Sequence, residues 1–149
     1  MEDLWIGLGI LLLLIIIFLA PNIKMVKENE AIVIERFGAF SRVIDKPGVY
    51  MLIPLIERAI QNVPLSKIER HFNVSLTNEL LKETHKIRYT YQVVDVMLFV
   101  YAALDSVKAF ETYIQNQTNE TLKLDHISVE ILEETAEVFG MKLHSINIL

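Results

Sequence analysis

Residues 31–44 read AIVIERFGAFSRVI, two apolar runs on either side of a central glycine. The first run, residues 31–37, is rich in β-branched side chains, and residues 40–44 repeat that character after Gly38. Such residues favour strands, and a glycine between two strands is typical of a β-hairpin turn. The stretch therefore predicts that the folded part of the chain begins with paired antiparallel strands.

A second turn and another apolar run follow this hairpin. The sequence Asp45-Lys46-Pro47-Gly48 predicts a type II turn, in which proline fixes one backbone angle and glycine takes the positive φ. Residues 49–56 then read VYMLIPLI, which is too short to span a bilayer. One interpretation is a buried strand covered on both faces and ended by proline. The other is an element that dips into the lipid interface. Its lipid-facing residues would be Val49, Tyr50, Met51, Leu52, Ile53, Pro54, Leu55 and Ile56.

Upstream of the hairpin, residues 4–20 read LWIGLGILLLLIIIFLA and carry no charge. As a helix this run is about 25 Å long, close to the thickness of a bilayer core. It has no polar stripe, and it predicts an uncleaved transmembrane anchor over residues 1–23. A cleaved signal peptide is the alternative, but its flank would be basic, whereas Glu2 and Asp3 are acidic. The anchor residues are Leu4, Trp5, Leu11, Ile15, Phe18 and Ala20.

The charges that flank the anchor predict its orientation. Glu2 and Asp3 precede it, while Lys24 and Lys27 follow it. By the positive-inside rule, the chain is a single-pass protein of the cell membrane whose folded part faces the cytoplasm. The absence of cysteine agrees with a reducing compartment.

Three further segments, residues 59–65, 67–76 and 85–94, predict additional strands. In the last two, apolar and polar side chains alternate, which is typical of strands with one buried face. The spacing then becomes helical. Asp95 is placed to cap a short helix, and Asp105 or Ser106 to cap a longer one.

A last helix is predicted from Asp125 to Gly140, whose position suits a left-handed helix end, and residues 141–149 read as a closing strand. The predicted fold class is α+β, a mostly antiparallel sheet followed by helices. It forms one domain over residues 24–149 behind the anchor.

The sequence offers little to catalysis or nucleic-acid binding. The four histidines have no metal-ligand spacing, there is no cysteine nucleophile, and the five glycines form no phosphate-binding loop. Ser66 and Lys67 are adjacent on a strand and point to opposite faces. The net charge is −5, without a basic stripe and interleaved aromatics. We therefore expect no enzyme activity, no metal or cofactor and no nucleic-acid partner.

One acidic stripe is conspicuous on the last predicted helix. Its residues are spaced i, i+3, i+4 and i+7, which places them on one helix face. This stripe is either a solvated face or a docking face for a basic partner surface. Its members are Glu130, Glu133, Glu134 and Glu137.

Four segments in order resemble the stomatin/prohibitin/flotillin group, the SPFH or band 7 family. Residues 26–38 resemble its V-x-x-x-E-x-x-V-x-x-R-F-G opening, and residues 46–58 resemble its P-G pair and apolar run ending in proline. Residues 91–95 and 132–141 are similar to its Y-x-V-x-D strand end and its last helix-to-strand junction. The motif turns fall at Gly38, Pro47 and Gly48.

Two departures accompany the resemblance. The helical segment usually found before the last helix is short here, at residues 122–127, and the sequence up to Leu149 contains no heptad repeat of the kind that forms the family's coiled coil. The chain therefore resembles a short form of the family, which puts large ordered assembly in doubt but not self-association through the domain.

The resemblance implies a non-enzymatic, membrane-anchored scaffold that self-associates and organises membrane proteins or lipids. It also implies control of a membrane protease or another integral partner. The expected partners are membrane lipids, further copies of the chain and an integral membrane protein. Two alternatives stay open, a monomeric adaptor for one integral partner and a membrane-bound hydrolase.

Overall fold

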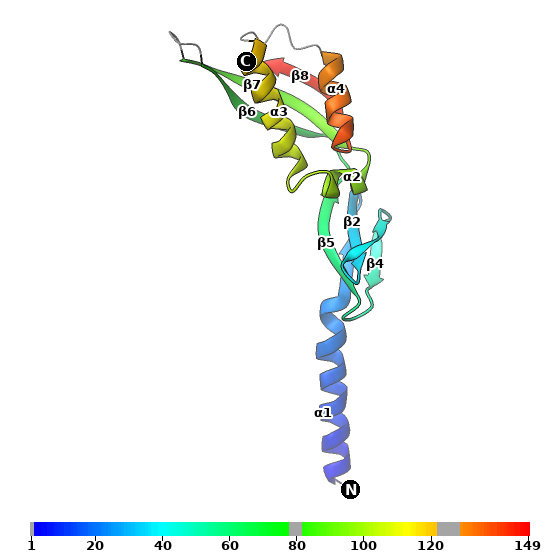
Figure 1. Cartoon of the computed structure of the whole chain (residues 1–149). Helices are drawn as coiled ribbons and strands as arrows, with labels where there is room; N and C mark the ends of the chain where they lie inside the picture. Colours follow the sequence, from blue (N-terminus) through cyan, green and yellow to red (C-terminus); the bar gives the residue numbers. More distant parts are fainter. Residues whose placement is uncertain (1, 78–81, 122–128) are drawn as a thin grey trace. The chain divides into compact units, whose positions relative to one another are not determined.

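The structure is a computed structural model that describes residues 2–77, 82–121 and 129–149 (Figure 1). It separates into two compact units, unit 1 (Met1–Asn62) and unit 2 (Val63–Leu149). The sequence suggested one domain behind the anchor, with a boundary at residue 23. That boundary stays a prediction, and each unit is described by itself.

Unit 1 begins with the apolar helix α1 (Glu2–Leu19) and a short 3₁₀ turn, η1 (Ala20–Asn22). Pro21 lies in that turn, where it cannot continue the α-helical hydrogen bonds. The side-chain amide of Asn22 donates to the carbonyl of Phe18 over 2.9 Å and so satisfies one of the last helical carbonyls. The span Leu4–Asn22 is long and apolar enough to cross a membrane, with a mean hydropathy of 2.8.

Unit 1 also contains β1 (Ile23–Val26), β2 (Glu30–Arg36), β3 (Ala39–Ile44), β4 (Gly48–Met51) and all of β5 (Glu57–Pro64) except its last two residues, which belong to unit 2. They form a two-stranded sheet, β1-β4, and a three-stranded sheet in the order β3-β2-β5. The predicted β2–β3 hairpin is confirmed, and its two-residue turn has positive φ at both Phe37 (52°) and Gly38 (81°). This pattern is typical of a type I′ turn, whose twist matches that of paired strands.

Three expectations about this region are wrong or incomplete. Gly48 does not sit in a type II turn, because it opens β4 with an extended φ of 158° instead of about 80°. Residues 49–56 are not a strand covered on both faces, because β4 ends at Met51 and Val49, Met51, Ile53 and Leu55 are exposed. Strand β1, which pairs with β4, was not expected at all. The core of unit 1 consists of Val26, Ile32, Ile34, Ile44 and Leu52.

Unit 2 is an antiparallel sheet with helices on one face (Figure 1). Its strands are β6 (Ile68–Thr77), β7 (Lys82–Val93) and β8 (Met141–Ile148), in the order β6-β7-β8. Its helices are α2 (Val96–Tyr101), α3 (Ser106–Thr121) and α4 (Val129–Val138). The predicted α+β class is confirmed. The predicted helix start at Asp125 and the short segment at residues 122–127 lie outside the described residues.

The helix ends of unit 2 follow the sequence closely. The Asp95 carboxylate accepts from the Leu98 N–H and Asp105 from the Lys108 N–H, at 2.9 and 3.0 Å. Gly140 has the expected left-handed φ of 70°, and a Cβ there would lie 2.2 Å from the carbonyl oxygen of Asp95. Only glycine fits this junction.

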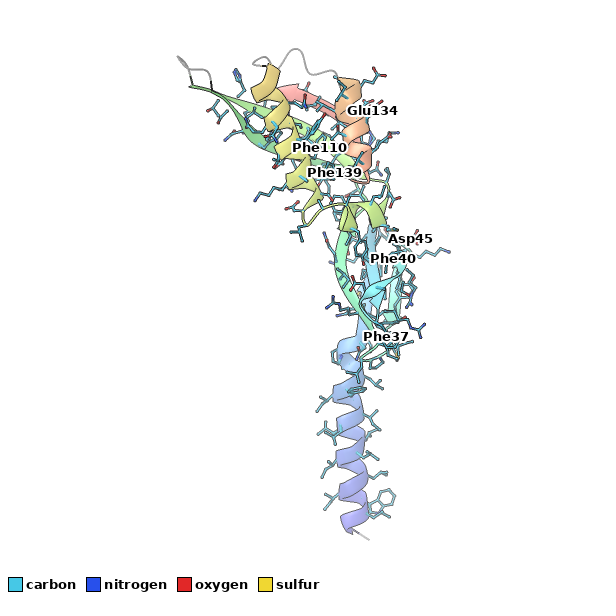
Figure 2. The ribbon with its side chains drawn as sticks, viewed as in Figure 1. Phe37, Phe40, Asp45, Phe110, Glu134 and Phe139 are labelled. Atoms are coloured by element: carbon cyan, nitrogen blue, oxygen red, sulfur yellow. The ribbon has the colours of Figure 1, made fainter. Side chains whose placement is uncertain are left out.

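The core of unit 2 lies between the sheet and the inner faces of α3 and α4. Phe110 and Ile114 of α3 and Leu132 and Ala136 of α4 are buried in it (Figure 2 labels Phe110). Tyr89 of β7 is fully buried, and its hydroxyl donates to the Glu111 carboxylate over 2.7 Å. Burial and that hydrogen bond both raise the pKa of Tyr89, which therefore stays protonated.

Candidate membrane-contact site

The two-stranded sheet of unit 1 exposes an apolar face. In its antiparallel register Ile23 lies opposite Met51, and Met25 lies opposite Val49, so these four side chains share one face. All four are exposed, while Val26 and Tyr50 of the other face pack in the core cluster. A sheet with one face in the core normally carries polar residues on the other. This sheet instead carries four apolar side chains on its open face.

Two loop tips of unit 1 also expose apolar side chains. Phe37 is 79% exposed and Leu55 is 91% exposed, and both are non-glycine residues at positive φ, 52° and 65°. That conformation costs roughly 1–2 kcal/mol for such a residue. The Phe37 N–H donates to the Ile56 carbonyl over 3.0 Å, so the two tips lie side by side. We define the β1–β4 apolar surface as Ile23, Met25, Phe37, Val49, Met51, Ile53 and Leu55.

This surface is tied to the end of α1. Ile23 directly follows η1, and the Leu52 N–H donates to the carbonyl of Asn22 over 2.9 Å. Leu52 itself is buried in the core of unit 1, which holds this connection in place. This hydrogen bond therefore joins the start of the loop that carries Ile53 and Leu55 to the end of the apolar span.

A buried carboxylate holds the same loop from its other end. Glu57 accepts two hydrogen bonds from the Arg42 guanidinium, at 2.5 and 3.1 Å, and one from the Ile53 N–H, at 3.1 Å. Its side chain is only 3% exposed, against 44% for Arg42. The Arg42 hydrogen bond, and then that from Ile53, lowers the pKa of Glu57 below its usual 4.5. Glu57 is therefore ionised at neutral pH and fixes the loop to β3.

The structure divides the residues of the VYMLIPLI run by face. Val49, Met51, Ile53 and Leu55 are exposed, and Leu52 is in the core. Tyr50, Pro54 and Ile56 are half-buried, and the Tyr50 hydroxyl donates to the Lys46 carbonyl over 2.9 Å. Leu52 is thus unavailable to lipid, and a lipid contact by this run stays a prediction for the four exposed residues only.

Sequence reasoning missed Ile23, Met25 and Phe37. The signal for the first two was the alternation in IKMV, which is short and follows the apolar span directly. The signal for Phe37 was an aromatic residue beside the turn glycine, a place where asparagine or aspartate is preferred.

The remaining candidate residues are the histidines. Among the described residues, no group of three or more histidine, cysteine, aspartate or glutamate side chains could hold a metal ion. His71 lies 3.4 Å from the Glu69 carboxylate, and the His144 ring nitrogen lies 3.1 Å from the Gln92 side-chain oxygen. His126 falls outside the described residues.

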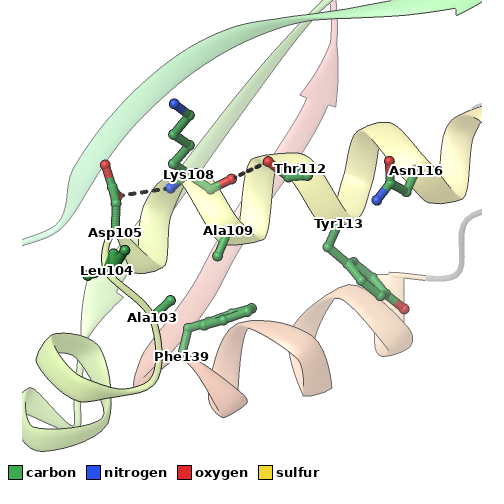
Figure 3. Close-up of a pocket in the computed structure, with 9 residues that line it drawn as sticks. All are labelled: Ala103, Leu104, Asp105, Lys108, Ala109, Thr112, Tyr113, Asn116 and Phe139. Carbon is green, nitrogen blue, oxygen red and sulfur yellow. Dashed lines mark hydrogen bonds between the residues drawn. The ribbon is translucent and has the colours of Figure 1, made fainter.

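Unit 2 also carries an open groove of about 750 Å³ (Figure 3). Asp105 and Thr112 within it already bond to the backbone of α3, through the Lys108 N–H and the Lys108 carbonyl. No serine, cysteine or histidine is among its lining residues, so the groove offers no support for the hydrolase alternative. These residues are Ala103, Leu104, Asp105, Lys108, Ala109, Thr112, Tyr113, Asn116 and Phe139.

Comparison with known proteins decides the family. The sequence model of the SPFH domain / Band 7 family matches residues 24–145. The chain belongs to the SPFH / Band 7 family. The match begins directly after the apolar helix and its turn and runs through both units, which confirms the resemblance seen in the sequence.

Two archaeal relatives of this SPFH chain are similar over most of its length. Stomatin homolog PH1511 of Pyrococcus horikoshii is 28% identical over 157 aligned positions, covering 94% of this chain and 58% of that protein. Stomatin homolog PYRAB06580 of Pyrococcus abyssi is also 28% identical, covering 93% of this chain and 57% of that protein. The chain thus spans little more than half the length of these relatives.

Proposed function

We propose that the chain is a single-pass membrane scaffold that acts by binding and not by catalysis. In this proposal α1 crosses the bilayer and the β1–β4 apolar surface lies in the lipid interface on the cytoplasmic side. Unit 2 contacts further copies of the chain and an integral membrane partner. Membership of the SPFH / Band 7 family supports a membrane-associated scaffold.

The observation that carries the proposal is an apolar surface tied by a hydrogen bond to the end of an apolar span. Fully removing one leucine, phenylalanine or methionine side chain from water is worth about 1.5–3 kcal/mol. Several such side chains open to water are costly, and lipid relieves that cost. Since α1 already holds the surface at the bilayer, even a weak contact is favoured by high local concentration.

The charges around the surface agree with a cytoplasmic interface. Lys24 and Lys27 follow the span, and Arg36 and Arg58 flank the two loop tips as exposed residues. Each basic residue near an anionic leaflet contributes about 1 kcal/mol to membrane attraction. The same lysines support the orientation with the folded units inside the cell.

Self-association and an integral partner are further parts of the proposal. They follow from what the family resemblance implies, and a membrane protease is one candidate partner of that kind. The monomeric adaptor is the competing proposal, and the particle mass of the gently extracted protein separates the two.

A site-specific fluorescence experiment tests the lipid contact. Because the chain has no cysteine, Leu55→Cys and Phe37→Cys each provide a single labelling position in the full-length protein. In vesicles, we expect a polarity-sensitive label at either position to be quenched by lipid-attached quenchers, and a label in the control Lys108→Cys, an exposed residue of α3, to be quenched by aqueous iodide.

Labels at positions 37 and 55 that behave like the control would contradict the lipid contact. Trp5, the only tryptophan, reports whether the anchor has inserted. A failed reconstitution is therefore recognised by Trp5 that stays accessible to iodide.

A further inference from the structure

The sheet of unit 2 has an open face that is basic. Helices α3 and α4 cover one face, where Ile87 and Tyr89 are buried, and the alternate residues of each strand point to the other face. On that face Lys86 lies opposite Asn73, Arg88 opposite His71, and Lys142 opposite Gln92.

Lys67 belongs to the same face. It directly precedes Ile68, which packs against the core of unit 2, so the alternation of the strand places Lys67 on the open side. The described acidic residue on the face is Glu69, which lies 3.7 Å from Arg88. We call Lys67, Lys86, Arg88 and Lys142 the basic sheet face. It is a positive surface in a chain whose net charge is −5.

Helix α4 presents the opposite charge. Its four glutamates are exposed, whereas Leu132 and Ala136 are buried (Figure 2 shows Glu134). The helix reads VEILEETAEV and contains no lysine or arginine. The glutamates repel one another at the i, i+3 and i, i+4 spacings, and no basic residue of the same helix offsets this repulsion. Exposed Ile131 and Val138 lie beside the charges. We call Glu130, Glu133, Glu134 and Glu137 the acidic α4 face.

The two faces point in opposite directions within unit 2. The buried residues of α4 face the sheet, so its glutamates point away from it, and the basic sheet face lies on the far side of the strands. A single unit cannot bring these faces together, but a second copy can.

We propose that the basic sheet face of one copy binds the acidic α4 face of the next copy. This inference rests on the proposed scaffold function and specifies how copies associate. The contact is head-to-tail, so each copy keeps one unused basic face and one unused acidic face, and association continues into a ring or a row along the membrane.

The dimensions of the two faces suit each other. Ten helical residues extend about 15 Å along the helix axis. The strands of a sheet lie about 4.8 Å apart, so a three-stranded sheet is about as wide as a helix. Complementary charge, with Ile131 and Val138 beside it, fixes the pairing and disfavours like faces.

Charge reversal in the full-length protein tests the contact. The helix variant carries Glu134→Lys and Glu137→Lys, the sheet variant carries Lys86→Glu and Lys142→Glu, and the control carries Lys108→Glu on α3. We expect light scattering in polymer discs to show a multi-subunit particle for the wild type and the control. For each double variant the protein mass per disc should be several-fold lower than for the wild type, close to that of one 17.2 kDa chain.

Restoration is the decisive result. A chain with all four reversals has a basic helix and an acidic sheet face, so it should assemble again, and so should the two double variants mixed before disc formation. Loss of assembly without restoration would overturn the proposal. If the wild type assembles and the double variants assemble equally well, the contact is wrong while the scaffold stands. A monomeric wild type would disprove both.

Salt gives an independent measurement that needs no variant. Raising the ionic strength from about 0.1 M to about 1 M shortens the Debye length from about 10 Å to about 3 Å. The wild-type particle should lose subunits over this range, and a mass that does not change would overturn the proposal. Should the reversed glutamates or lysines prevent folding, this result still decides it.

Discussion

The open sheet faces of the two units differ in the polarity of their exposed side chains. In unit 2 the exposed face of β6-β7-β8 is polar and basic, as expected for antiparallel strands with one side in water. In unit 1 the exposed face of β1–β4 carries Ile23, Met25, Val49 and Met51. Both sheets are antiparallel and have one face in a core, but one exposes polar residues and the other exposes apolar residues. We infer that unit 2 faces water or protein and that the β1–β4 apolar surface faces lipid.

The largest expected effect separates the core side of the VYMLIPLI run from its open side. Leu52→Glu places a charge in the core of unit 1 and should destabilise that unit by about 4 kcal/mol or more. Leu55→Glu, at the exposed tip, should leave stability within about 0.5 kcal/mol of the wild type but weaken lipid contact.

Hydrogen exchange of the full chain in detergent measures this, because it reports on the two units separately. Equal destabilisation by both substitutions would show that the tip is packed against protein and that the contrast between the faces is wrong.

The glycine turns of the two units give the next effect. Gly140→Ala combines a positive φ with a Cβ 2.2 Å from the Asp95 carbonyl oxygen, and should destabilise unit 2 by about 3 kcal/mol. Gly38→Ala has a φ of 81° but open space around its Cβ, so about 1–2 kcal/mol is expected in unit 1. Urea unfolding of both variants, followed by amide hydrogen exchange, measures which substitution destabilises its unit more. A larger loss for Gly38→Ala would contradict the packing described at Gly140.

Much of the fold followed from the sequence because local patterns dictated it. The hairpin around Gly38, the alternation in β6 and β7, the caps at Asp95 and Asp105 and the Gly140 helix end all depend on nearby residues. These elements appeared as expected.

The candidate site was less predictable because distant residues form it. An apolar run such as VYMLIPLI cannot indicate which of its faces is open, and pairing with β1 decides this. The Glu57–Arg42 pair joins residues fifteen positions apart. Positive φ at Phe37 and Leu55 has no sequence signal, since neither residue prefers it.

A medium effect is expected at the clamp that orients the loop of the apolar surface. Glu57→Gln removes a charge-assisted pairing with Arg42 and should destabilise unit 1 by about 1–3 kcal/mol, loosening Ile53 and Leu55. Arg58→Gln, which removes a partner of Glu35 from an exposed position, is the matched control and should cost about 0.5 kcal/mol.

The same clamp gives a pH dependence with a definite sign. The pKa of Glu57 is lowered in the folded chain, below the ordinary 4.5. Its contribution to the free energy of unfolding is therefore present above about pH 4.5 and is lost as the pH falls through the folded-state pKa. Denaturant unfolding between pH 7 and pH 3 should show a smaller loss for Glu57→Gln than for the wild type. Parallel curves would contradict the clamp.

The smallest expected effect exchanges stability for lipid contact. Asparagine accepts positive φ better than phenylalanine, so Phe37→Asn should stabilise unit 1 by up to about 1 kcal/mol. The same change removes an aromatic tip and should reduce quenching of a label at position 55 by lipid-attached quenchers. Phe37→Leu, which keeps an apolar tip, is the control. A Phe37→Asn variant with unchanged lipid quenching would limit the contact to β1, β4 and Leu55.

The most direct test compares one residue from each open face. Met51→Cys and Thr90→Cys carry the same label on the exposed faces of β1–β4 and β6-β7-β8, in the full-length protein in vesicles. We expect lipid-attached quenchers to reach position 51 and not to reach position 90, whether water or another copy of the chain covers the second sheet. Iodide quenching of both positions, with Trp5 inserted, would contradict the account that the first sheet faces lipid.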